Sequence, residues 1–566
     1  MLASAGSTAM IWREPPHYSP AELAITPSPL LSAILHARGV HTAETAASFL
    51  QPADADLSDP YLLPDMEGAV ALIRAALERG ARIGVFGDFD VDGLSSTAML
   101  TRVLRKLGGQ VTPHVPDRLS EGYGLNLRAV EQFAELGIKL MLVVDCGSGN
   151  RRELEAALEL GMDAVVLDHH RIHEPLPEPV AFVSPRRPEN RYDEVELAAV
   201  GVAFALVRAL VGEAEAEMYL PYVALGTVAD VVPLRNENRA LAARGIQKLH
   251  RWRLPGISAL CDVARIEKRS IGAYEIGYII GPRLNAAGRM ASPTIALDWF
   301  LADDLTSATH YARQLNELNQ LRQAVTQRVL DEANQQLASF GDAERLPAIV
   351  VDGEGWSIGV AGIVAAKLAD SLYRPAVVIE RGPELSRGSA RSGGVLDVHA
   401  ALSRSAGLFT HFGGHMAAAG FTIPTDKIDT LRHELMANVY DMCGGALPQR
   451  RLELDAELEH ADLTLETAER LAQLEPHGRD NPAPLLLLRN VRAENPRLSR
   501  DGRHLLFAAV DSRSKRHDSV FFSGGARFTE LSTADRLDLA VALRRDTWRG
   551  RTRLKLQIED FRAAGG

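Results

Sequence analysis

The feature that most constrains the fold is a regular alternation of short apolar runs and helical segments early in the chain. Apolar runs of strand length cover residues 82–87, 139–144 and 163–167, and segments with helical spacing cover residues 96–108 and 152–161. Strands that alternate with helices in this way build a parallel sheet with helices packed on its faces. The pattern therefore predicts an α/β fold with a doubly wound parallel sheet.

A long polar segment and a second α/β block follow. Residues 305–337 contain no proline and no glycine, which predicts one long helix. An interdomain strut and an ordinary surface helix explain this segment equally well. The second block starts with an apolar run at 347–351, continues through a helical segment at 362–372 and returns to a strand at 375–380. It predicts a second, smaller α/β domain.

The pattern changes to short strands after Pro448. The strand candidates are residues 504–510, 519–523, 538–543 and 553–561. Short strands separated by glycine-containing turns predict a small β-barrel or sandwich, and an OB-fold is the expected type for a basic domain. Residues 481–566 carry 17 Lys or Arg and 10 Asp or Glu, a net charge of +7, whereas the whole chain carries −11. This contrast favours a polyanionic partner, although a well-solvated arginine-rich surface explains it too.

The length of 566 residues is enough for roughly three to four domains of about 150 residues. We expect an N-terminal segment, a larger α/β domain, a connecting helix, a smaller α/β domain and a barrel. Their predicted boundaries are 1–50, 51–304, 305–338, 339–447 and 448–566.

Composition places the chain among soluble globular proteins, because 46% of its residues are hydrophobic and 24% are charged. It has no uncharged apolar run of about 18 residues, so no membrane span is expected. The N-terminus lacks the basic and apolar regions of a secretory signal. The three cysteines (Cys146, Cys261 and Cys443) are far apart, which excludes a disulfide scaffold and fits a reducing compartment. We therefore expect a cytoplasmic protein.

Acidic residues follow each predicted strand of the first block. Asp88, Asp90 and Asp92 follow the first, Asp145 follows the second, and Asp168-His169-His170 follows the third. A further acid, Asp230, lies between two apolar runs, and we expect it at a fourth strand end. Ligands of open α/β sheets bind beyond the carboxyl ends of the strands. Acids gathered there repel one another and resist desolvation, and a bound cation removes that penalty.

The first of these acidic segments resembles part of a calcium-binding loop. Asp88-x-Asp90-x-Asp92-Gly93 matches the start of an EF-hand loop, but such a loop needs Glu at its twelfth position, which is Met99 here, and follows a helix. Each acid alone could also be a helix cap or a turn residue. Caps and turns account poorly for all four segments together.

Carboxylates combined with histidine suit Mn²⁺ or Mg²⁺, and the histidine favours Mn²⁺. The number of acids is enough for two ions about 3.5–4 Å apart that share a bridging carboxylate, an arrangement that clamps the attacking hydroxide and the leaving oxygen of a phosphoester. The residues therefore predict metal-assisted phosphoester hydrolysis. Cys146 has no implied basic partner and is expected to be a packing residue.

Basic, glycine-rich stretches could bind the phosphates of a substrate. They cover residues 116–124, 281–289, 387–392 and 412–415. Arginine together with exposed backbone amides forms a good phosphate cradle. Glycine-rich loops are common, however, so each stretch alone also fits an ordinary loop.

Eight motifs carry a family resemblance. Four occur in the order GDFDVDG (87–93), VDCGS (144–148), LDHH (167–170) and LGTVADVVPL (225–234). The others are PDRLSEGYGLN (116–126), GPRLNAAGRM (281–290), GSARS (388–392) and FGGHMAAAG (412–420). The first set resembles the DHH phosphoesterase superfamily, and the whole set, from about Trp12 to Phe561, resembles its bacterial RecJ family. Residues 1–9 precede the usual start of that family, which makes Met10 a candidate initiator.

The resemblance implies a DHH domain and a DHH-associated domain joined by a long helix and followed by an OB-fold. It implies a single-stranded-DNA-specific 5′→3′ exonuclease that releases nucleoside 5′-monophosphates by a two-metal mechanism, in DNA recombination and in mismatch and other repair. The metal ligands that it implies are Asp88, Asp90, Asp92, Asp145, His169 and Asp230, with Asp145 as the bridging carboxylate.

Further roles carry over from the same motifs. His170 would lie near the scissile phosphate, Asp168 would orient the imidazoles, and Arg289 would stabilise charge on the phosphoryl group. The residues implied for the 5′-phosphate are Arg118, Ser389 and Arg391, and His415 would line the path of the strand. The residues implied to grip the strand in the barrel are Arg544, Arg545, Trp548, Arg549 and Arg551.

The family often has a histidine where this chain has Ser357, between Trp356 and Ile358, and that puts any substrate contact of this histidine in doubt. The partners implied are single-stranded DNA with a 5′ end, a single-strand-binding protein and a RecQ-type helicase, and a monomer is expected. Two alternatives remain. One is a DHH phosphodiesterase acting on short oligoribonucleotides or cyclic dinucleotides, which the basic C-terminal segment disfavours. The other is a non-catalytic DNA-binding scaffold, which the complete set of ligands disfavours.

Overall fold

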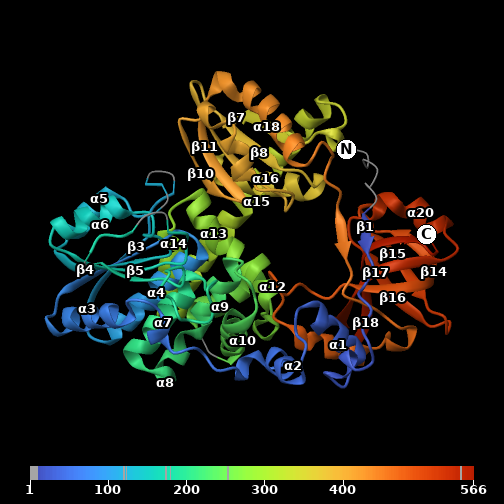
Figure 1. The fold of residues 1–566 in the computed structure, drawn as a ribbon, viewed down its shortest axis with the longest axis horizontal. Helices are drawn as coiled ribbons and strands as arrows, with labels where there is room; N and C mark the ends of the chain where they lie inside the picture. Colours follow the sequence, from blue (N-terminus) through green and yellow to red (C-terminus); the bar gives the residue numbers. More distant parts are fainter. Residues whose placement is uncertain are drawn as a thin grey trace. The chain divides into compact units, whose positions relative to one another are not determined.

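The computed structural model describes residues 10–118, 121–122, 124–172, 175–178, 180–251, 254–548 and 551–565. Its contacts divide the chain into two compact units, which we describe separately. Unit 1 contains the residues up to Arg13 together with Glu317–Leu452, and unit 2 contains Glu14–Asn316 together with Glu453–Gly566. The boundary falls within helix α15 (Leu305–Ser339), which confirms the predicted long helix (Figure 1).

Unit 2 contains a parallel sheet with the strand order β3-β2-β4-β5-β6. Its strands are β2 (Arg82–Gly87), β3 (Gln110–His114), β4 (Ile138–Val144), β5 (Asp163–Leu167) and β6 (Ala181–Val183). The central strands β2, β4 and β5 are buried over nearly their whole length, as expected for strands covered on both faces. The predicted parallel α/β sheet is confirmed.

Helices cover this sheet and continue the domain beyond it. They include α3 (Met66–Glu78), α4 (Val91–Lys106), α5 (Leu127–Glu135), α6 (Arg151–Glu159), α7 (Ala199–Val211), α8 (Glu213–Ala216), α9 (Leu220–Ala229), α10 (Asn236–Arg251), α11 (Pro255–Ala264), α12 (Ala273–Glu275), α13 (Gly281–Met290) and α14 (Thr294–Leu301). Helix α4 begins before the predicted start at 96, because the Asp90 side chain caps it by accepting hydrogen bonds from the amides of Asp92 and Gly93.

One predicted strand end is wrong. Residues 220–229 form helix α9, and Asp230 is the C-cap residue of that helix. An apolar run of this length is ambiguous between a buried strand and a buried helix. Nearly every residue of α9 is buried, so the run lacks the amphipathic spacing that would have identified a helix.

Unit 1 contains a second sheet, with the order β10-β11-β9-β8-β7. Its elements are β7 (Ile349–Glu354), α16 (Ile358–Leu372), β8 (Ala376–Arg381), β9 (Leu385–Arg391), α17 (Val398–Ser403), β10 (His411–His415), β11 (Ala418–Pro424) and α18 (Ile428–Met442). Strands β7 and β8 are parallel, and the other pairs are antiparallel. The predicted second, smaller α/β domain is confirmed.

The C-terminal part of unit 2 is a barrel. Its strands follow the order β13-β14-β15-β16-β18-β17, and a further pairing of β14 with β17 closes it. The elements are β13 (Ala456–Glu457), α19 (Leu465–Leu471), β14 (Leu486–Leu498), β15 (Leu505–Val510), β16 (Arg516–Phe521), α20 (Phe528–Thr533), β17 (Leu537–Trp548) and β18 (Arg551–Ala563). The predicted barrel is confirmed. The sequence patterns missed β14, which is bulged between Glu494 and Arg497 and contains charged residues and proline.

The N-terminal segment completes this barrel. Helix α1 (Pro29–Ala37) places Leu31, Ile34 and Leu35 in the same buried cluster as the barrel residues Leu488 and Phe561. Helix α2 (Ala43–Leu50) contributes further residues to that cluster. Strand β1 (Ile11–Arg13) pairs with β12 (Arg451–Glu453) in a two-stranded sheet that is separate from the barrel. Residues more than 400 positions apart therefore share one core.

The segment that leads into the barrel is built into the rest of unit 2. Arg239 of α10 is only 2% exposed, and its guanidinium donates to the carbonyls of Pro476 at 3.0 Å and Glu475 at 2.9 Å. It also lies 4.2 Å from the ring centroid of Phe49. The amide of Leu234 donates to the carbonyl of Arg479 at 2.8 Å. A buried cation needs such partners, so this segment and α10 form one structure.

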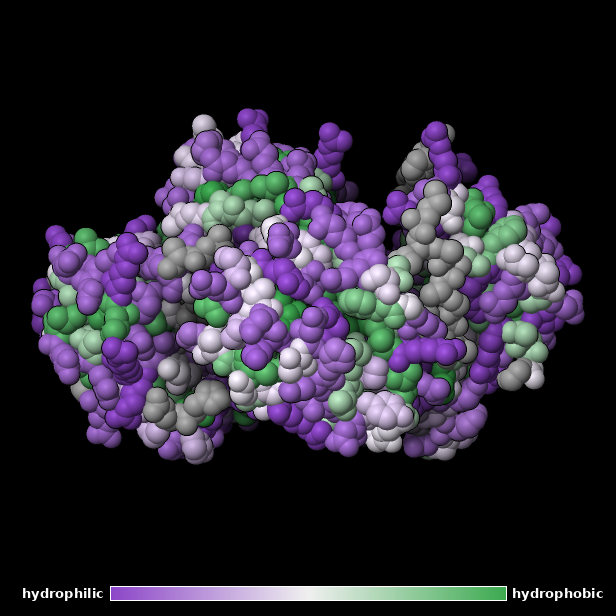
Figure 2. All heavy atoms as spheres, turned by 90° about the horizontal axis from the view of Figure 1, so that it is seen from above, coloured by the Kyte–Doolittle hydropathy of each residue, from purple (hydrophilic) through white to green (hydrophobic). Residues whose placement is uncertain are grey.

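Most of the face seen in Figure 2 is hydrophilic, with hydrophobic side chains in small scattered groups. In the part of the chain that the structure describes, no helix is both long and apolar enough to cross a membrane. The buried hydrophobic residues gather in clusters within the parallel sheet, the unit 1 sheet and the barrel.

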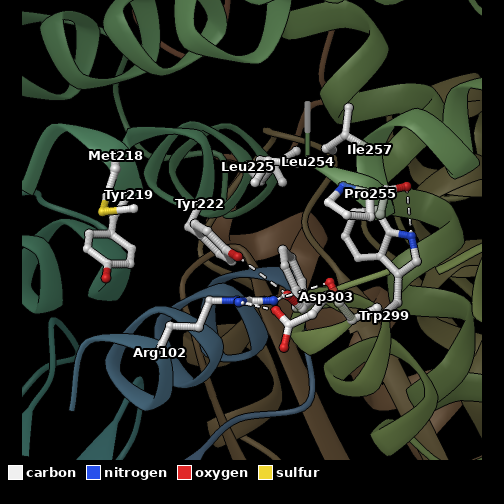
Figure 3. A pocket seen from close by; sticks show the side chains of 13 residues that line it. Arg102, Met218, Tyr219, Tyr222, Leu225, Leu254, Pro255, Ile257, Trp299 and Asp303 are labelled. Carbon is white, nitrogen blue, oxygen red and sulfur yellow. Dashed lines mark hydrogen bonds and ion pairs between the residues drawn. The ribbon is translucent and has the colours of Figure 1, made fainter. Parts of the chain in front are cut away.

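A cavity of about 190 Å³ lies between α4, α9, α11 and α14 (Figure 3). Tyr222 and Trp299 line it, and Arg102 pairs with Asp303 at its edge, where their closest N···O distance is 2.8 Å. The Trp299 indole is 2% exposed and donates to the carbonyl of Gly256 at 3.0 Å. Trp299 therefore joins α14 to α11 beside the cavity.

Replacing Trp299 with alanine should lower the free energy of unfolding of unit 2 by about 3–5 kcal/mol, because the surrounding helices cannot close the additional space. Urea unfolding followed by circular dichroism measures this change. Leu305→Ala is the control, because the Leu305 side chain is 56% exposed and its loss leaves no cavity. Equal stability of the two variants would contradict the packing described here.

Candidate metal centre and active site

The carboxyl ends of the parallel strands bring the predicted ligands together. Three groups of side chains have ligand atoms within 4.8 Å of one another: Asp88, Asp90 and Asp145; Asp92, His169 and Asp230; and Asp145, His169 and His170. Asp145 and His169 each belong to two groups. All six side chains predicted as metal ligands are therefore in one cluster, and His170 lies next to them.

Local structure explains how these side chains reach the cluster. Asp88 directly follows β2 and Asp145 directly follows β4. The backbone of Asp145 is left-handed, with φ at 62°, and its amide donates to the carbonyl of Leu167 at 3.1 Å. This turn ties the end of β4 to the end of β5, so that Asp145 lies beside His169.

Asp92 is held by the start of another helix. Its two carboxylate oxygens accept hydrogen bonds from the amides of Ala199 at 2.7 Å and Val200 at 2.9 Å, in the first turn of α7. Helix α9 also packs closely against the Asp92 carboxylate at Gly226. A Cβ atom at Gly226 would lie 2.8 Å from a carboxylate oxygen of Asp92, so a larger residue would not fit there. The start of α7 and the position of Gly226 therefore fix the carboxylate orientation.

The raised pKa values of the carboxyl groups show that nearby positive charge does not balance the acids of the cluster. Burial, followed by the charge of Asp90, raises the pKa of Asp92 to about 7. Burial and then neighbouring carboxylates also raise the pKa values of Asp88, Asp145 and Asp230 well above their usual range. Four acids with raised pKa values in one place are costly to ionise together, and a bound cation supplies the missing charge.

His169 supports the same conclusion. Burial, followed by the charge of His170, lowers the pKa of His169 to about 4, so its ring is neutral. Its Nε2 atom lies 3.3 Å from Asp145 Oδ1 and 3.9 Å from Asp230 Oδ2. Among the described residues, this buried Nε2 and the buried Oδ1 of Asp88 have no hydrogen-bond partner. A neutral imidazole with carboxylates is a donor set that fits Mn²⁺ or Mg²⁺.

Asp168 holds His170 and not the ring of His169. Its Oδ1 lies 2.7 Å from His170 Nδ1 and accepts a hydrogen bond from the backbone amide of His169 at 2.8 Å. Its Oδ2 accepts from the amide of Ser148 at 2.9 Å and the hydroxyl at 2.5 Å. Burial opposes protonation of His170, but the hydrogen bond to Asp168 and nearby carboxylates outweigh it and raise the pKa of His170.

The stretch at 281–289 is a helix and not a glycine-rich loop, which corrects the sequence interpretation. Asn285 of α13 accepts a hydrogen bond from the amide of Val91 at 3.1 Å, and a Cβ at Gly288 would lie 3.3 Å from the carbonyl of Phe89. The helix therefore packs directly on the Asp88–Asp92 loop, with Arg289 in its last turn. Sequence reasoning missed Asn285, whose only signal was its place in the GPRLNAAGRM motif.

Arg118 also lies by the cluster. Its guanidinium is 5.4 Å from the ring centroid of Phe89. Burial lowers the pKa of Arg118, and the charges of Asp88 and Asp90 oppose this shift. Cys146 is 2% exposed within the core of the sheet and burial raises its pKa, which confirms that it is a packing residue.

Unit 1 brings Ser389 and Arg391 together. The Arg391 guanidinium donates to the Ser389 hydroxyl at 3.1 Å. A Cβ at Gly362, in the second turn of α16, would lie 2.6 Å from Arg391 and 3.0 Å from Ser389. A hydroxyl and a guanidinium thus converge beside α16 where a glycine leaves room, and this pair of groups suits an anion. Ser357 is the N-cap residue of α16, and His415 ends the exposed strand β10.

In the barrel, Arg544 and Arg545 of β17 line a cavity of about 180 Å³ together with Glu475 and His477. Arg551 is exposed at the start of β18. The backbone of Trp548 pairs with Arg551. Arg549 lies outside the described residues. The structure therefore groups two of the predicted grip residues, Arg544 and Arg545, in one basic wall.

Three family models match the chain. Residues 82–227 match the DHH family N-terminal domain, residues 345–441 match the DHHA1 domain, and residues 454–560 match the RecJ OB domain. These matches cover the parallel-sheet domain, the unit 1 sheet and the barrel.

Curated proteins are similar over most of the chain. The single-stranded-DNA-specific exonuclease RecJ of Bacillus subtilis is 34% identical over 94% of this chain and 68% of its own length. The protein of the same name from Escherichia coli is 33% identical over 82% of this chain and 83% of its own length.

Solved structures of RecJ proteins also match nearly the whole chain. The crystal structure of RecJ from Thermus thermophilus in complex with Mn²⁺ matches with a TM-score of 0.84 and 30% identity, over 98% of this chain and 80% of that chain. The corresponding Mg²⁺ complex matches with a TM-score of 0.79 and 28% identity, over 98% of this chain and 79% of that chain.

Proposed function

The chain belongs to the RecJ family of single-stranded-DNA-specific exonucleases, and from this premise we propose that it degrades single-stranded DNA from the 5′ end. The products would be nucleoside 5′-monophosphates. The observation that carries this proposal is the buried cluster of carboxylates around the neutral imidazole of His169, since such a cluster needs cations and suits phosphodiester hydrolysis.

We propose two divalent cations, Mn²⁺ or Mg²⁺, with Mn²⁺ favoured by the histidine. Asp92, His169 and Asp230 would hold one, Asp88 and Asp90 the other, and Asp145 would be shared. When bound, the cations would lower the pKa of a water molecule and neutralise the charge that develops on the phosphoryl group.

The remaining roles belong to side chains around the cluster. His170, fixed by Asp168 but with 46% of its side chain exposed, would contact the scissile phosphate. Arg289, in the last turn of α13, would stabilise the phosphoryl group. Asn285 would hold the Asp88–Asp92 loop in place through the amide of Val91.

We propose that Ser389 and Arg391, beside Gly362 of α16, bind the terminal 5′-phosphate. Arg118, beside the acidic cluster of unit 2, would be a separate phosphate contact. The convergence of Ser389 and Arg391 over Gly362 supports the first assignment. A dedicated 5′-phosphate site would give the enzyme its polarity, because the other end of the strand lacks this group.

Replacing Arg391 with glutamine should lower kcat/KM on 5′-phosphorylated single strands by about tenfold to a hundredfold, because a charge-assisted hydrogen bond is lost. Cleavage of 5′-hydroxyl strands should change little. Arg387→Gln is the matched control, because Arg387 lies on the same strand but pairs with Glu380. An equal loss on both substrates would assign Arg391 a structural role.

The polarity itself is tested with Mn²⁺ and two labelled single strands, one carrying a radiolabelled 5′-phosphate and the other a label at its 3′ end. We expect early release of labelled mononucleotide from the first strand and retention of the label in a shortening second strand. Hydrolysis of dinucleotides or cyclic dinucleotides in place of either strand would instead identify a phosphodiesterase of the wider superfamily. Family membership also supports roles in recombination and repair, with a single-strand-binding protein and a RecQ-type helicase as partners.

A further inference from the structure

Two tyrosine side chains are exposed to solvent on the helical segment that precedes α13. Helix α12 continues into a π-helix, η6 (Ile276–Ile280), which leads directly into α13. Tyr274 is 65% exposed and Tyr278 is 73% exposed. Their rings stack with centroids 5.0 Å apart and an angle of 30° between their planes. Tyr278 is the most exposed of the large hydrophobic side chains on the described surface.

The opposite face of the same turn is firmly anchored. Ile276 and Ile280 are fully buried, so the tyrosines lie on the outer face of a fixed element. The wider turn of a π-helix is rare and is frequently found at functional sites. Exposed aromatic rings contribute no core packing, and a pair of them that is already stacked presents flat outer faces to solvent.

The π-helix that bears Tyr278 is built onto a helix of the metal centre. The π-helix packs against α9, the helix that ends at Asp230. A Cβ at Gly281, which follows the π-helix, would lie 3.6 Å from the Cβ of Ala229. From this point α13 crosses to the Asp88–Asp92 loop. The element that bears the tyrosines is therefore continuous with the wall of the active site.

The same element is within electrostatic reach of the barrel cavity. Burial raises the pKa of Glu475, the charges of Arg545 and Arg544 oppose this, and the charge of Glu275 adds to it. Glu275 is the residue next to Tyr274, and Glu475, Arg544 and Arg545 line the barrel cavity. Within unit 2, the element that bears the tyrosines therefore packs against the helix that ends at Asp230, and its Glu275 is within electrostatic reach of the cavity lined by Arg544 and Arg545.

We propose that Tyr274 and Tyr278 form a platform on which bases of the single strand stack between the metal centre and the barrel. The proposal rests on the function proposed above. Single-strand binding sites combine positive charge along the backbone with aromatic side chains beneath the bases, and every base has a face that can stack. Arg544 and Arg545 supply the charge and the tyrosines supply the rings. The platform therefore binds bases without regard to sequence.

The test measures KM and kcat on single strands from two to about 20 nucleotides long. Tyr274→Ala and Tyr278→Ala should each raise KM on long strands by about fivefold to a hundredfold, which corresponds to the loss of one stacked base. On substrates too short to reach the platform, KM should match the wild type. Tyr274→Phe and Tyr278→Phe should behave as wild type, because they keep the ring. Tyr61→Ala is the control, since Tyr61 is 42% exposed elsewhere in unit 2.

A second measurement separates stacking from a structural effect. An oligonucleotide with abasic positions where the bases meet the platform should bind the wild type as weakly as the intact strand binds the alanine variants. The alanine variants should lose nothing further on the abasic strand. Equal KM values for wild type and alanine variants at every length, with an active wild type, would overturn the platform alone. An inactive wild type would overturn the proposed function instead.

Discussion

Replacing Asp145 with asparagine should lower the rate of phosphodiester hydrolysis by about a thousandfold or more, with little change in single-strand binding. Among the described residues, Asp145 is the carboxylate that lies in one group with Asp88 and Asp90 and in another with His169. Loss of its charge would weaken both proposed cation sites at once. Asparagine is the cleaner substitution, because the backbone of Asp145 is left-handed and asparagine tolerates that conformation better than alanine does.

The experiment compares single-turnover cleavage with binding by the same variant. Asp163→Asn is the matched control, because Asp163 begins β5 whereas the cluster lies beyond the end of that strand. Asp163→Asn should cleave as wild type. Near-normal turnover by Asp145→Asn would exclude the proposal that two cations share this carboxylate. A loss of binding as large as the loss of cleavage would show that the substitution disturbs the fold.

Removing divalent cations should abolish hydrolysis and destabilise unit 2, and the stabilisation by Mn²⁺ should grow as the pH rises from about 6 to 8. The acids of the cluster have raised pKa values, to about 7 for Asp92, so the metal-free folded protein binds more protons than the unfolded chain. Their contribution to stability is therefore present at low pH and is lost as the pH rises from about 4 through 7. Cations bind the deprotonated acids, so protons compete with them at low pH.

Thermal unfolding with Mn²⁺ and with a chelator, at several pH values, measures this difference. A cation present at a hundred times its dissociation constant stabilises the folded state by about 2.7 kcal/mol. Asp145→Asn should show a smaller difference between the two conditions at each pH. If Mn²⁺ increased thermal stability equally at pH 6 and pH 8, the acids with raised pKa values would not be its ligands.

Local sequence patterns were sufficient to predict many of the helices and strands. Strands β2 and β5 have the boundaries that their apolar runs predicted, and α15 spans the segment without proline or glycine. Each of these elements is determined by residues that are neighbours in the chain. The patterns failed where an element is uniformly buried, as for α9, or irregular, as for β14. In those elements the surrounding structure, and not the local sequence, selects the conformation.

Some features of the candidate site were likewise predictable from the sequence, and others depend on the tertiary structure. Acids directly after parallel strands had to meet, because the carboxyl ends of such strands share one edge of the sheet, so the sequence alone determined that Asp88, Asp145 and His169 are close. It also determined the basic charge of the barrel segment. Only the tertiary structure decided that Asp230 reaches the cluster from a helix end and that Asn285 supports its loop.

The tertiary structure likewise decided that α1 completes the barrel core, and that the π-helix bearing Tyr278 packs against α9. Each of these features depends on contacts between residues far apart in the chain. No periodicity or spacing encodes such contacts, since they form only when the elements pack together.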